Sequence, residues 1–262
     1  MMEIFLQADT WGALITLTFL EIVLGIDNII FISIAANKLP EKLQKKATNI
    51  GLVLAMLLRI VLLFGISLLI AMNAPFFYVN LSWFQAGFTG QALILFAGGI
   101  FLLYKSTKEI HHKVEGLAED ENDEKPQKGY TLSQAIIQIT LINIVFSFDS
   151  ILTAVGMTNG VEGAMIIMIA SVILSMIIMM LFANPVGKFV NKHPTIQMLG
   201  LSFLILIGFM LIAEGAHLSH AKLFGEEVGT VPKGYLYFAI TFSLVVEMLN
   251  MKMRGGSKKK NQ

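Results

Sequence analysis

Two apolar segments of this chain carry nearly the same pattern of polar residues. In each, a polar residue is followed six residues later by an aspartate and then by a small amide or hydroxyl residue: Glu21, Asp27 and Asn28 in the first copy, and Asn143, Asp149 and Ser150 in the second. A carboxylate at the centre of a membrane helix costs roughly 2.5–3.5 kcal/mol on insertion scales. Because packing does not require that cost twice at matching places, the two motifs predict a binding site.

The side chains of the two motifs offer only oxygen ligands that suit hard cations. Carboxylate, carboxamide and hydroxyl oxygens favour Mn²⁺, Mg²⁺ or Ca²⁺ over Cu⁺ or Zn²⁺. The chain contains no cysteine, which excludes disulfides, thiolate metal sites and iron–sulfur clusters. The predicted ligand is therefore a hard divalent cation.

Helical spacing places the small and polar residues of each copy on one stripe. At about 100° per residue, these stripes hold Glu21, Gly25 and Asn28, and Asn143, Ser147 and Ser150. Each aspartate then lies about 100° around its helix from the stripe. Either a cavity extends around that edge, or the helices unwind near Gly25 and Ser147, which is tolerated at membrane depth only beside a cavity.

A structural role remains the alternative for several of these residues. The amides and hydroxyls of Asn28, Asn143, Ser147 and Ser150 could equally form interhelical hydrogen bonds. Arg59 is the one basic residue in the middle of an apolar run and needs an acidic partner. Glu21 or one of the two aspartates would serve, so Arg59 could neutralise one acid at most.

The elements that must position these residues are membrane-spanning helices. The chain has 262 residues, of which 55% are hydrophobic and 14% charged, whereas soluble domains carry about 25% charged residues. Its basic residues are scattered, which argues against a nucleic-acid partner. A span needs about 20 apolar residues, and the sequence predicts an all-α protein with seven spans in the lipid bilayer: 12–36, 49–72, 88–104, 132–156, 163–183, 196–216 and 234–251.

The charges of the connections predict the orientation and the halves of the molecule. Basic-rich connections alternate with basic-poor ones, which places the N-terminus outside and the C-terminus in the cytoplasm. The acidic segment 113–130 cannot form a core and is predicted to be a cytoplasmic linker. It separates a first half, residues 1–112, from a second half, residues 131–218, and residues 219–262 add a loop, the seventh span and a basic tail.

The repeat is predicted to be inverted. The two motifs lie in the first and fourth spans, which cross the membrane in opposite directions. Inverted repeats are typical of secondary transporters that bind substrate near the bilayer midplane, at the repeat interface. The sequence therefore predicts a three-plus-three helix repeat with a seventh helix appended.

Several stretches resemble the TerC family of integral membrane proteins. They are residues 19–31 (FLEIVLGIDNIIF), 101–111 (FLLYKSTKEIH), 146–151 (FSFDSI), 231–238 (VPKGYLYF) and 245–250 (VVEMLN). Members of this family lie in the bacterial inner membrane and in thylakoids, are named for tellurium resistance, and several are implicated in Mn²⁺ export. The resemblance implies that Glu21, Asp27, Asn28, Asn143, Asp149 and Ser150 bind the metal, with Glu214, Arg59 and Ser147 as additional candidates.

These observations predict a transporter of the plasma (inner) membrane that exports a divalent metal, with Mn²⁺ as the expected cargo. Two carboxylates that share a site bind a proton readily, so protons are the expected coupling ion. No permanently bound cofactor is expected. The alternative is a non-transporting scaffold or assembly factor for other membrane or secreted proteins. An enzyme is not expected, because the chain has no Ser/His/Asp spacing, HExxH or phosphate loop. The sequence leaves the oligomeric state open.

Overall fold

The computed structural model describes residues 8–65, 72–119, 130–158, 161 and 163–260. Within these ranges it describes the backbone but not the side chains of residues 8–9, 24, 26–28, 116–119, 149 and 254–260. Asp27, Asn28 and Asp149 therefore have a described place on a helix, while their side chains lie outside the described part of the structure, as does most of the predicted linker.

Long helices make up most of the described chain, and a small sheet accompanies them. The helices are α1 (Ala8–Asn37), α2 (Glu41–Phe64), α4 (Gly90–Glu119), α5 (Leu132–Thr158), α6 (Ala164–Lys192), α7 (Pro194–Leu218) and α8 (Lys233–Lys260). The strands are β1 (Pro75–Asn80), β2 (Phe84–Thr89), β3 (Lys222–Leu223) and β4 (Glu226–Glu227).

Six of the described helices, α2 and α4 to α8, are long and apolar enough to cross a membrane. In α1 the apolar stretch found among the described residues is shorter, Thr10–Val23. Large apolar side chains such as Phe19, Leu181 and Phe238 are more than half exposed on the outer faces of the helices. A bilayer would cover these faces, so the chain is a membrane protein whose lipid-facing surface is as apolar as its interior.

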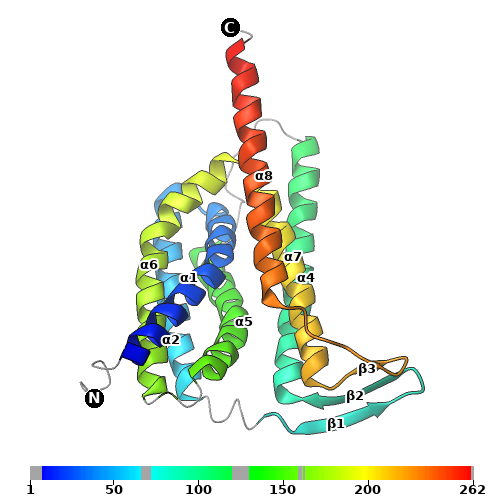
Figure 1. The fold of residues 1–262 in the computed structure, drawn as a ribbon. Helices are drawn as coiled ribbons and strands as arrows, with labels where there is room; N and C mark the ends of the chain where they lie inside the picture. Colours follow the sequence, from blue (N-terminus) through cyan, green and yellow to red (C-terminus); the bar gives the residue numbers. More distant parts are fainter. Residues whose placement is uncertain (1–7, 66–71, 120–129, 159–160, 162, 261–262) are drawn as a thin grey trace.

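The helices form a four-helix group and a second group beside it (Figure 1). In the four-helix group, α1 packs mainly on α6 and α2 mainly on α5, with further contacts between α1 and α5 and between α2 and α6. In the second group α4 packs along α7, and α8 lies against α7. The buried apolar core runs through both groups.

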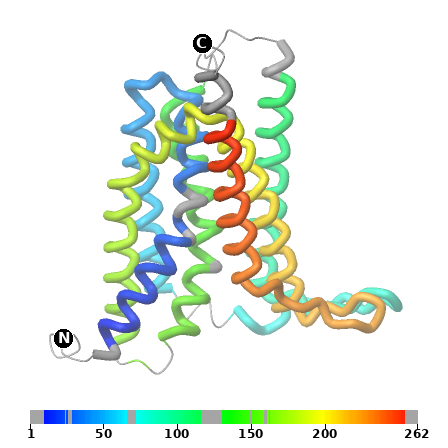
Figure 2. Tube along the Cα trace, turned by 45° about the horizontal axis from the view of Figure 1, so that its top comes forward, coloured from blue at the N-terminus to red at the C-terminus, as the bar shows by residue number. Residues whose placement is uncertain are grey.

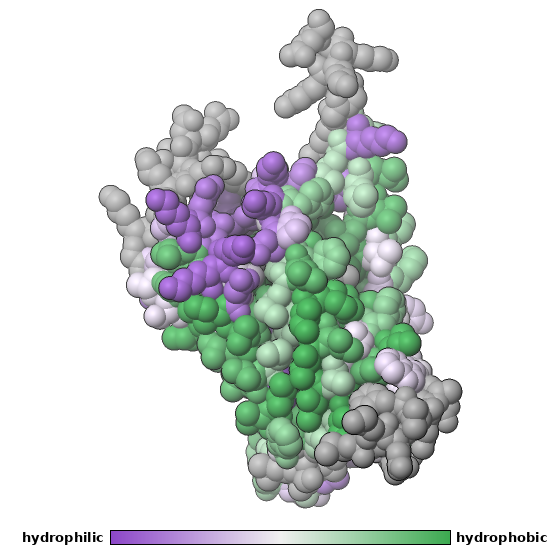
Figure 3. Space-filling model, turned by 90° about the vertical axis from the view of Figure 1, so that its left-hand side faces the viewer, coloured by the Kyte–Doolittle hydropathy of each residue, from purple (hydrophilic) through white to green (hydrophobic). Residues whose placement is uncertain are grey.

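Successive helices run in alternating directions along the long axis, so that α1 and α5 are antiparallel and the two chain termini lie at opposite ends (Figures 1 and 2). The α1–α2 connection and the junction of α6 with α7 lie at the end nearest the C-terminus. There a hydrophilic cap covers an otherwise apolar face (Figure 3). We call this the basic end, because Lys42, Lys45, Lys46, Lys188 and Lys192 lie in these segments.

Helix α4 continues past the predicted end of the third span. The span was expected to end at residue 104, and the helix runs on to Glu119. His111 and Glu115, one helical turn apart, form an ion pair of 3.1 Å on its exposed surface. The loss of hydrophobicity ends the apolar stretch but not the helix, because polar residues with helical i,i+4 pairs continue it in water.

The all-α expectation is wrong in one respect, because a four-stranded antiparallel sheet closes the end opposite the basic end. Its strand order is β1-β2-β3-β4, and it extends sideways from the α4–α7 pair (Figure 2). Phe77 stacks on Phe88 across the hairpin at 4.9 Å, while Phe76, Tyr78 and Trp83 are mostly exposed. The exposed rings agree with the predicted aromatic belt, but its charge-free sequence was not recognised as a hairpin.

Backbone contact between two glycines determines how closely α4 and α7 approach. A Cβ atom on Gly99 would lie 2.7 Å from the carbonyl oxygen of Gly208, and one on Gly208 would lie 3.0 Å from the carbonyl oxygen of Gly99. Small residues at such an interface let two membrane helices pack backbone to backbone.

We expect Gly99→Ala to lower the free energy of unfolding by about 1–3 kcal/mol, the usual cost of overpacking. The opposing backbone atom cannot rotate away, so the two helices must move apart. Gly156→Ala in α5 is the matched control, because a Cβ there meets nothing within 4 Å, and it should be neutral or stabilising by up to about 1 kcal/mol. Denaturant unfolding in detergent measures both, and equal effects would contradict the prediction.

Candidate functional site

Both helices that carry the repeated motif are continuous. Helix α1 spans Ala8–Asn37 and α5 spans Leu132–Thr158 without a break, so the expected alternative of unwinding near Gly25 and Ser147 is wrong. The space beside Gly25 is filled from α6, because a Cβ on Gly25 would overlap the side chain of Met179. The glycine thus serves close packing of α1 on α6 rather than a break in the helix.

The polar residues of the two motifs whose side chains are described are buried. Glu21 is 4% exposed on α1, and Asn143, Ser147 and Ser150 are 1%, 1% and 2% exposed on α5. Buried polar groups at this depth are stable only when they have hydrogen-bond or charge partners. Their partners therefore show how the site is built.

Arg59 of α2 connects the two copies of the motif. It is 3% exposed, and its Nη1 donates to the Glu21 carboxylate in a buried ion pair. Its Nε donates to the Ser147 hydroxyl at 3.0 Å. One guanidinium thus joins α1, α2 and α5, and the acidic partner that the sequence required for Arg59 is Glu21.

The remaining polar side chains of the second motif leave oxygen lone pairs unused by the bonds they make. Asn143 donates its Nδ2 to the Ile139 carbonyl at 2.9 Å, which keeps its Oδ1 as an acceptor. Ser150 donates its hydroxyl to the Ser147 carbonyl at 3.2 Å, and its own oxygen can still accept. Such oxygens suit a hard cation. Ser147 differs, because its oxygen already accepts from Arg59.

The structure separates Glu214 from this network. Its neighbour Gly215 packs against Ala92 and Phe96 of α4, so Glu214 lies in the α4–α7 pair near the sheet, whereas Glu21, Arg59 and Ser147 belong to the four-helix group. Among the side chains that the structure describes, no three His, Asp or Glu residues are grouped as a metal site. Asp27 and Asp149 are not among those side chains, and their ligand role stays a prediction.

A second polar cluster lies toward the basic end and was not recognised in the sequence. Lys38, which follows α1, pairs with Glu109 of α4 at 2.5 Å and lies 5.7 Å from the ring centre of Tyr130. Burial, and secondarily the Glu109 carboxylate, raises the pKa of Tyr130 to about 12. The phenol thus stays protonated and donates to Gln138 at 2.8 Å. This cluster ties the start of α5 to α1 and α4.

Comparisons with known proteins agree with the membrane architecture. The family model described as "Integral membrane protein TerC family" matches residues 6–262. The chain is 42% identical over 254 residues to the UPF0053 inner membrane protein YoaE of Escherichia coli, covering 97% of this chain and 45% of that protein. It thus spans less than half of that relative.

Two shorter relatives match along nearly their whole length. The UPF0053 protein of Haemophilus influenzae is 41% identical, with 97% of this chain and 98% of that protein covered. The UPF0053 inner membrane protein YgdQ of E. coli is 43% identical, with 93% of each covered. No solved structure matches this chain.

Proposed function

Since this chain belongs to the integral membrane protein TerC family, we propose that it is an inverted-repeat transporter that exports a divalent metal cation, with Mn²⁺ as the predicted cargo. Asp27 and Asp149 bind the cation, one from each half, and Asn28, Asn143 and Ser150 supply further oxygens. Glu21 completes this set or supports it through Arg59.

The observation that carries the proposal is the ion pair and hydrogen bond of Arg59. They bring Glu21 of the first motif and Ser147 of the second to one guanidinium in the four-helix group. The two motifs are distant in sequence, and a structural role for each alone would not require them to converge. Their convergence supports one shared site near the middle of α1 and α5.

The formal charges fit a divalent cation. Arg59 neutralises Glu21, so the two aspartates contribute two negative charges to the shared site. A divalent cation balances these charges, whereas an empty site would hold two uncompensated carboxylates at membrane depth. Proton binding to one aspartate offers the empty site a way to relieve this charge, and this supports protons as the coupling ion.

The helix pairing is the pairing expected of an inverted repeat. Exchanging α1 with α5, α2 with α6 and α4 with α7 turns the α1–α6 contact into the α5–α2 contact and leaves the α4–α7 contact unchanged. These three contacts are the main helix pairs of the structure. Together with the opposite directions of α1 and α5 (Figure 1), they support a three-plus-three repeat with α8 appended as the seventh span.

The distribution of lysines supports the proposed orientation. The basic end carries the lysine-rich connections, and positively charged connections face the cytoplasm. The C-terminus then lies inside and the sheet with its exposed aromatic rings outside. Two relatives are named inner membrane proteins, and we extend that location to this chain.

Metal flux in proteoliposomes tests the proposal. Purified protein should move Mn²⁺ faster than protein-free vesicles, and Mg²⁺, Ca²⁺ and Zn²⁺ in the same assay would define the selectivity. A pH gradient should accelerate the flux if protons are exchanged for the metal. Absence of flux for every cation, with folded protein in the vesicles, would overturn the proposal and favour the scaffold role.

A further inference from the structure

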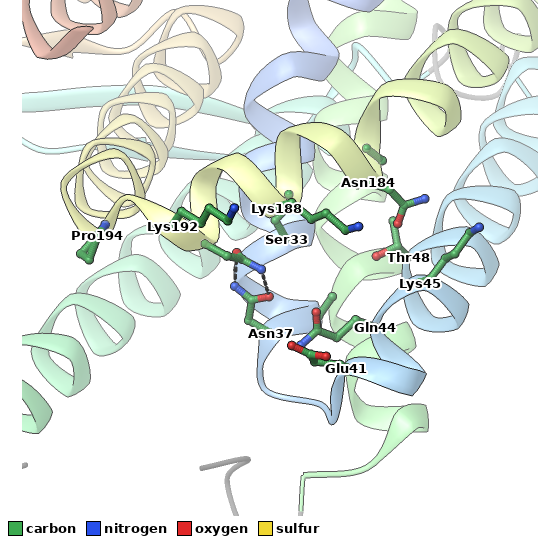
Figure 4. Close-up of a pocket in the computed structure, with 14 residues that line it drawn as sticks. Ser33, Asn37, Glu41, Gln44, Lys45, Thr48, Asn184, Lys188, Lys192 and Pro194 are labelled. Atoms are coloured by element: carbon green, nitrogen blue, oxygen red, sulfur yellow. Dashed lines mark hydrogen bonds between the residues drawn. The ribbon is translucent and has the colours of Figure 1, made fainter. Parts of the chain in front are cut away.

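A polar pocket of about 910 Å³ opens between α1, α2 and α6 at the basic end (Figure 4). This volume lies within the range of ligand sites in proteins, roughly 300–1,000 Å³. Its charged lining residues are three lysines and one glutamate: Lys45, Lys188, Lys192 and Glu41. The lining is therefore net positive, which is the wrong sign for the cation of the proposed transport site.

The positive groups gather on one side of the pocket. In Figure 4, Lys188 extends from α6 toward Asn184 and Thr48, and Lys45 lies beyond them on α2, while Glu41 lies apart beside Gln44. Within the described part of the chain, no carboxylate forms an ion pair with Lys45, Lys188 or Lys192. Two ammonium groups thus flank an amide and a hydroxyl, all of which can donate hydrogen bonds to one anion.

The walls of the pocket are held in place by contacts between α1 and α6. The carboxamides of Asn37 and Asn191 hydrogen-bond to each other in both directions. Deeper in the pocket, a Cβ on Gly187 would lie 2.8 Å from Ser33 Oγ, so the two helices are in close contact there. The positive side chains therefore project from a preformed frame, which lowers the ordering cost of binding a ligand.

We propose that this pocket binds the phosphate group of an anionic ligand through Lys45, Lys188, Asn184 and Thr48. Basic pockets between membrane helices on the cytoplasmic side bind phospholipid headgroups. Leu181 and Phe182 on the same turn-rich part of α6 are 69% and 57% exposed, and they offer an apolar surface for acyl chains. The same donors would also bind a free phosphate from the cytoplasm.

Binding to the purified full chain in detergent tests this site with two probes, a short-chain phosphatidylglycerol and inorganic phosphate, with phosphatidylcholine for comparison. The shift of the thermal unfolding midpoint gives an apparent Kd for each. The double variant Lys45→Gln/Lys188→Gln should weaken binding of the effective probe by about tenfold or more. Lys42→Gln/Lys46→Gln removes the same charge from the same helix end but from outside the pocket lining, and it should bind like the parent.

The two arms distinguish the source of the phosphate. Binding of phosphatidylglycerol that inorganic phosphate does not compete away identifies a lipid headgroup, and competition at similar concentrations identifies a soluble phosphate. Lys188→Arg keeps the charge and should retain binding. Equal weakening in the two double variants, or no binding of either probe to the folded parent chain, would overturn the proposal. Metal flux is measured separately, so the outcome is independent of the transport assay.

Discussion

Replacing either motif aspartate by asparagine, Asp27→Asn or Asp149→Asn, is expected to reduce metal efflux by at least tenfold while leaving the protein folded. Each substitution keeps the shape of the side chain and removes one of the two charges that balance the cation. Changes to groups that only support metal ligands already cost about 10–100-fold. Mn²⁺ flux in proteoliposomes measures the loss, and retention of Mn²⁺ in metal-loaded cells provides the cellular counterpart.

Stability separates this loss from misfolding. Removing a carboxylate from membrane depth relieves a cost of roughly 2.5–3.5 kcal/mol, so both variants should unfold no earlier than the parent. Glu226→Gln removes a carboxylate from the exposed strand β4 and should transport at the parent rate. Parent-like flux in both aspartate variants would show that neither is a ligand.

Replacing the buried guanidinium, Arg59→Met, is expected to lower the free energy of unfolding by about 3–5 kcal/mol, the cost of breaking a buried ion pair. Glu21, with its side chain only 4% exposed, would keep its charge without a partner, and the Ser147 hydroxyl would lose its donor. Denaturant unfolding in detergent measures the change.

A double variant shows whether the cost comes from the unpaired charge. Glu21→Gln/Arg59→Met removes both charges and should recover most of the stability lost in the single variant, because replacing both partners of a buried pair is often neutral. His111→Gln breaks an ion pair whose partners are 68% and 67% exposed and should cost less than about 1 kcal/mol. No recovery in the double variant would assign the loss to packing around Arg59.

Flux through the stabilised double variant then defines the role of Glu21. If Glu21 only neutralises Arg59, the double variant keeps both aspartates and should still move Mn²⁺. If Glu21 binds the metal directly when Arg59 turns away, flux should fall as in the aspartate variants. The two roles thus differ in activity at equal stability.

Much of the helical architecture could be predicted from the sequence, since burial in lipid needs long apolar segments. The fourth predicted span, 132–156, matches α5 (Leu132–Thr158) within two residues. Prediction was poorer where hydrophobicity and backbone structure diverge. Helix α4 continues as a polar helix in water, and the hairpin of β1 and β2 is short and aromatic, a pattern shared by interfacial loops.

The candidate site was only partly predictable. The costly polar residues could be listed from their positions in apolar runs, and Arg59 was recognised as needing an acidic partner. Which acid it meets depends on the packing of α1, α2 and α5, and the structure identifies Glu21. The basic pocket was missed, because Lys45 and Lys188 lie far apart in sequence and each resembles an ordinary lysine at the end of a span.

The sequence by itself determined that this chain lies in a membrane, that its two motifs are copies, and that their side chains supply hard oxygen ligands. These conclusions depend on the cost of placing a polar group in lipid, which is a property of each residue and its neighbours along the chain. Only the tertiary structure decided that α1 and α5 are unbroken, that Arg59 joins the two motifs, and that three lysines share one pocket. Those contacts connect helices that are remote in sequence, and their geometry follows from how the helices pack.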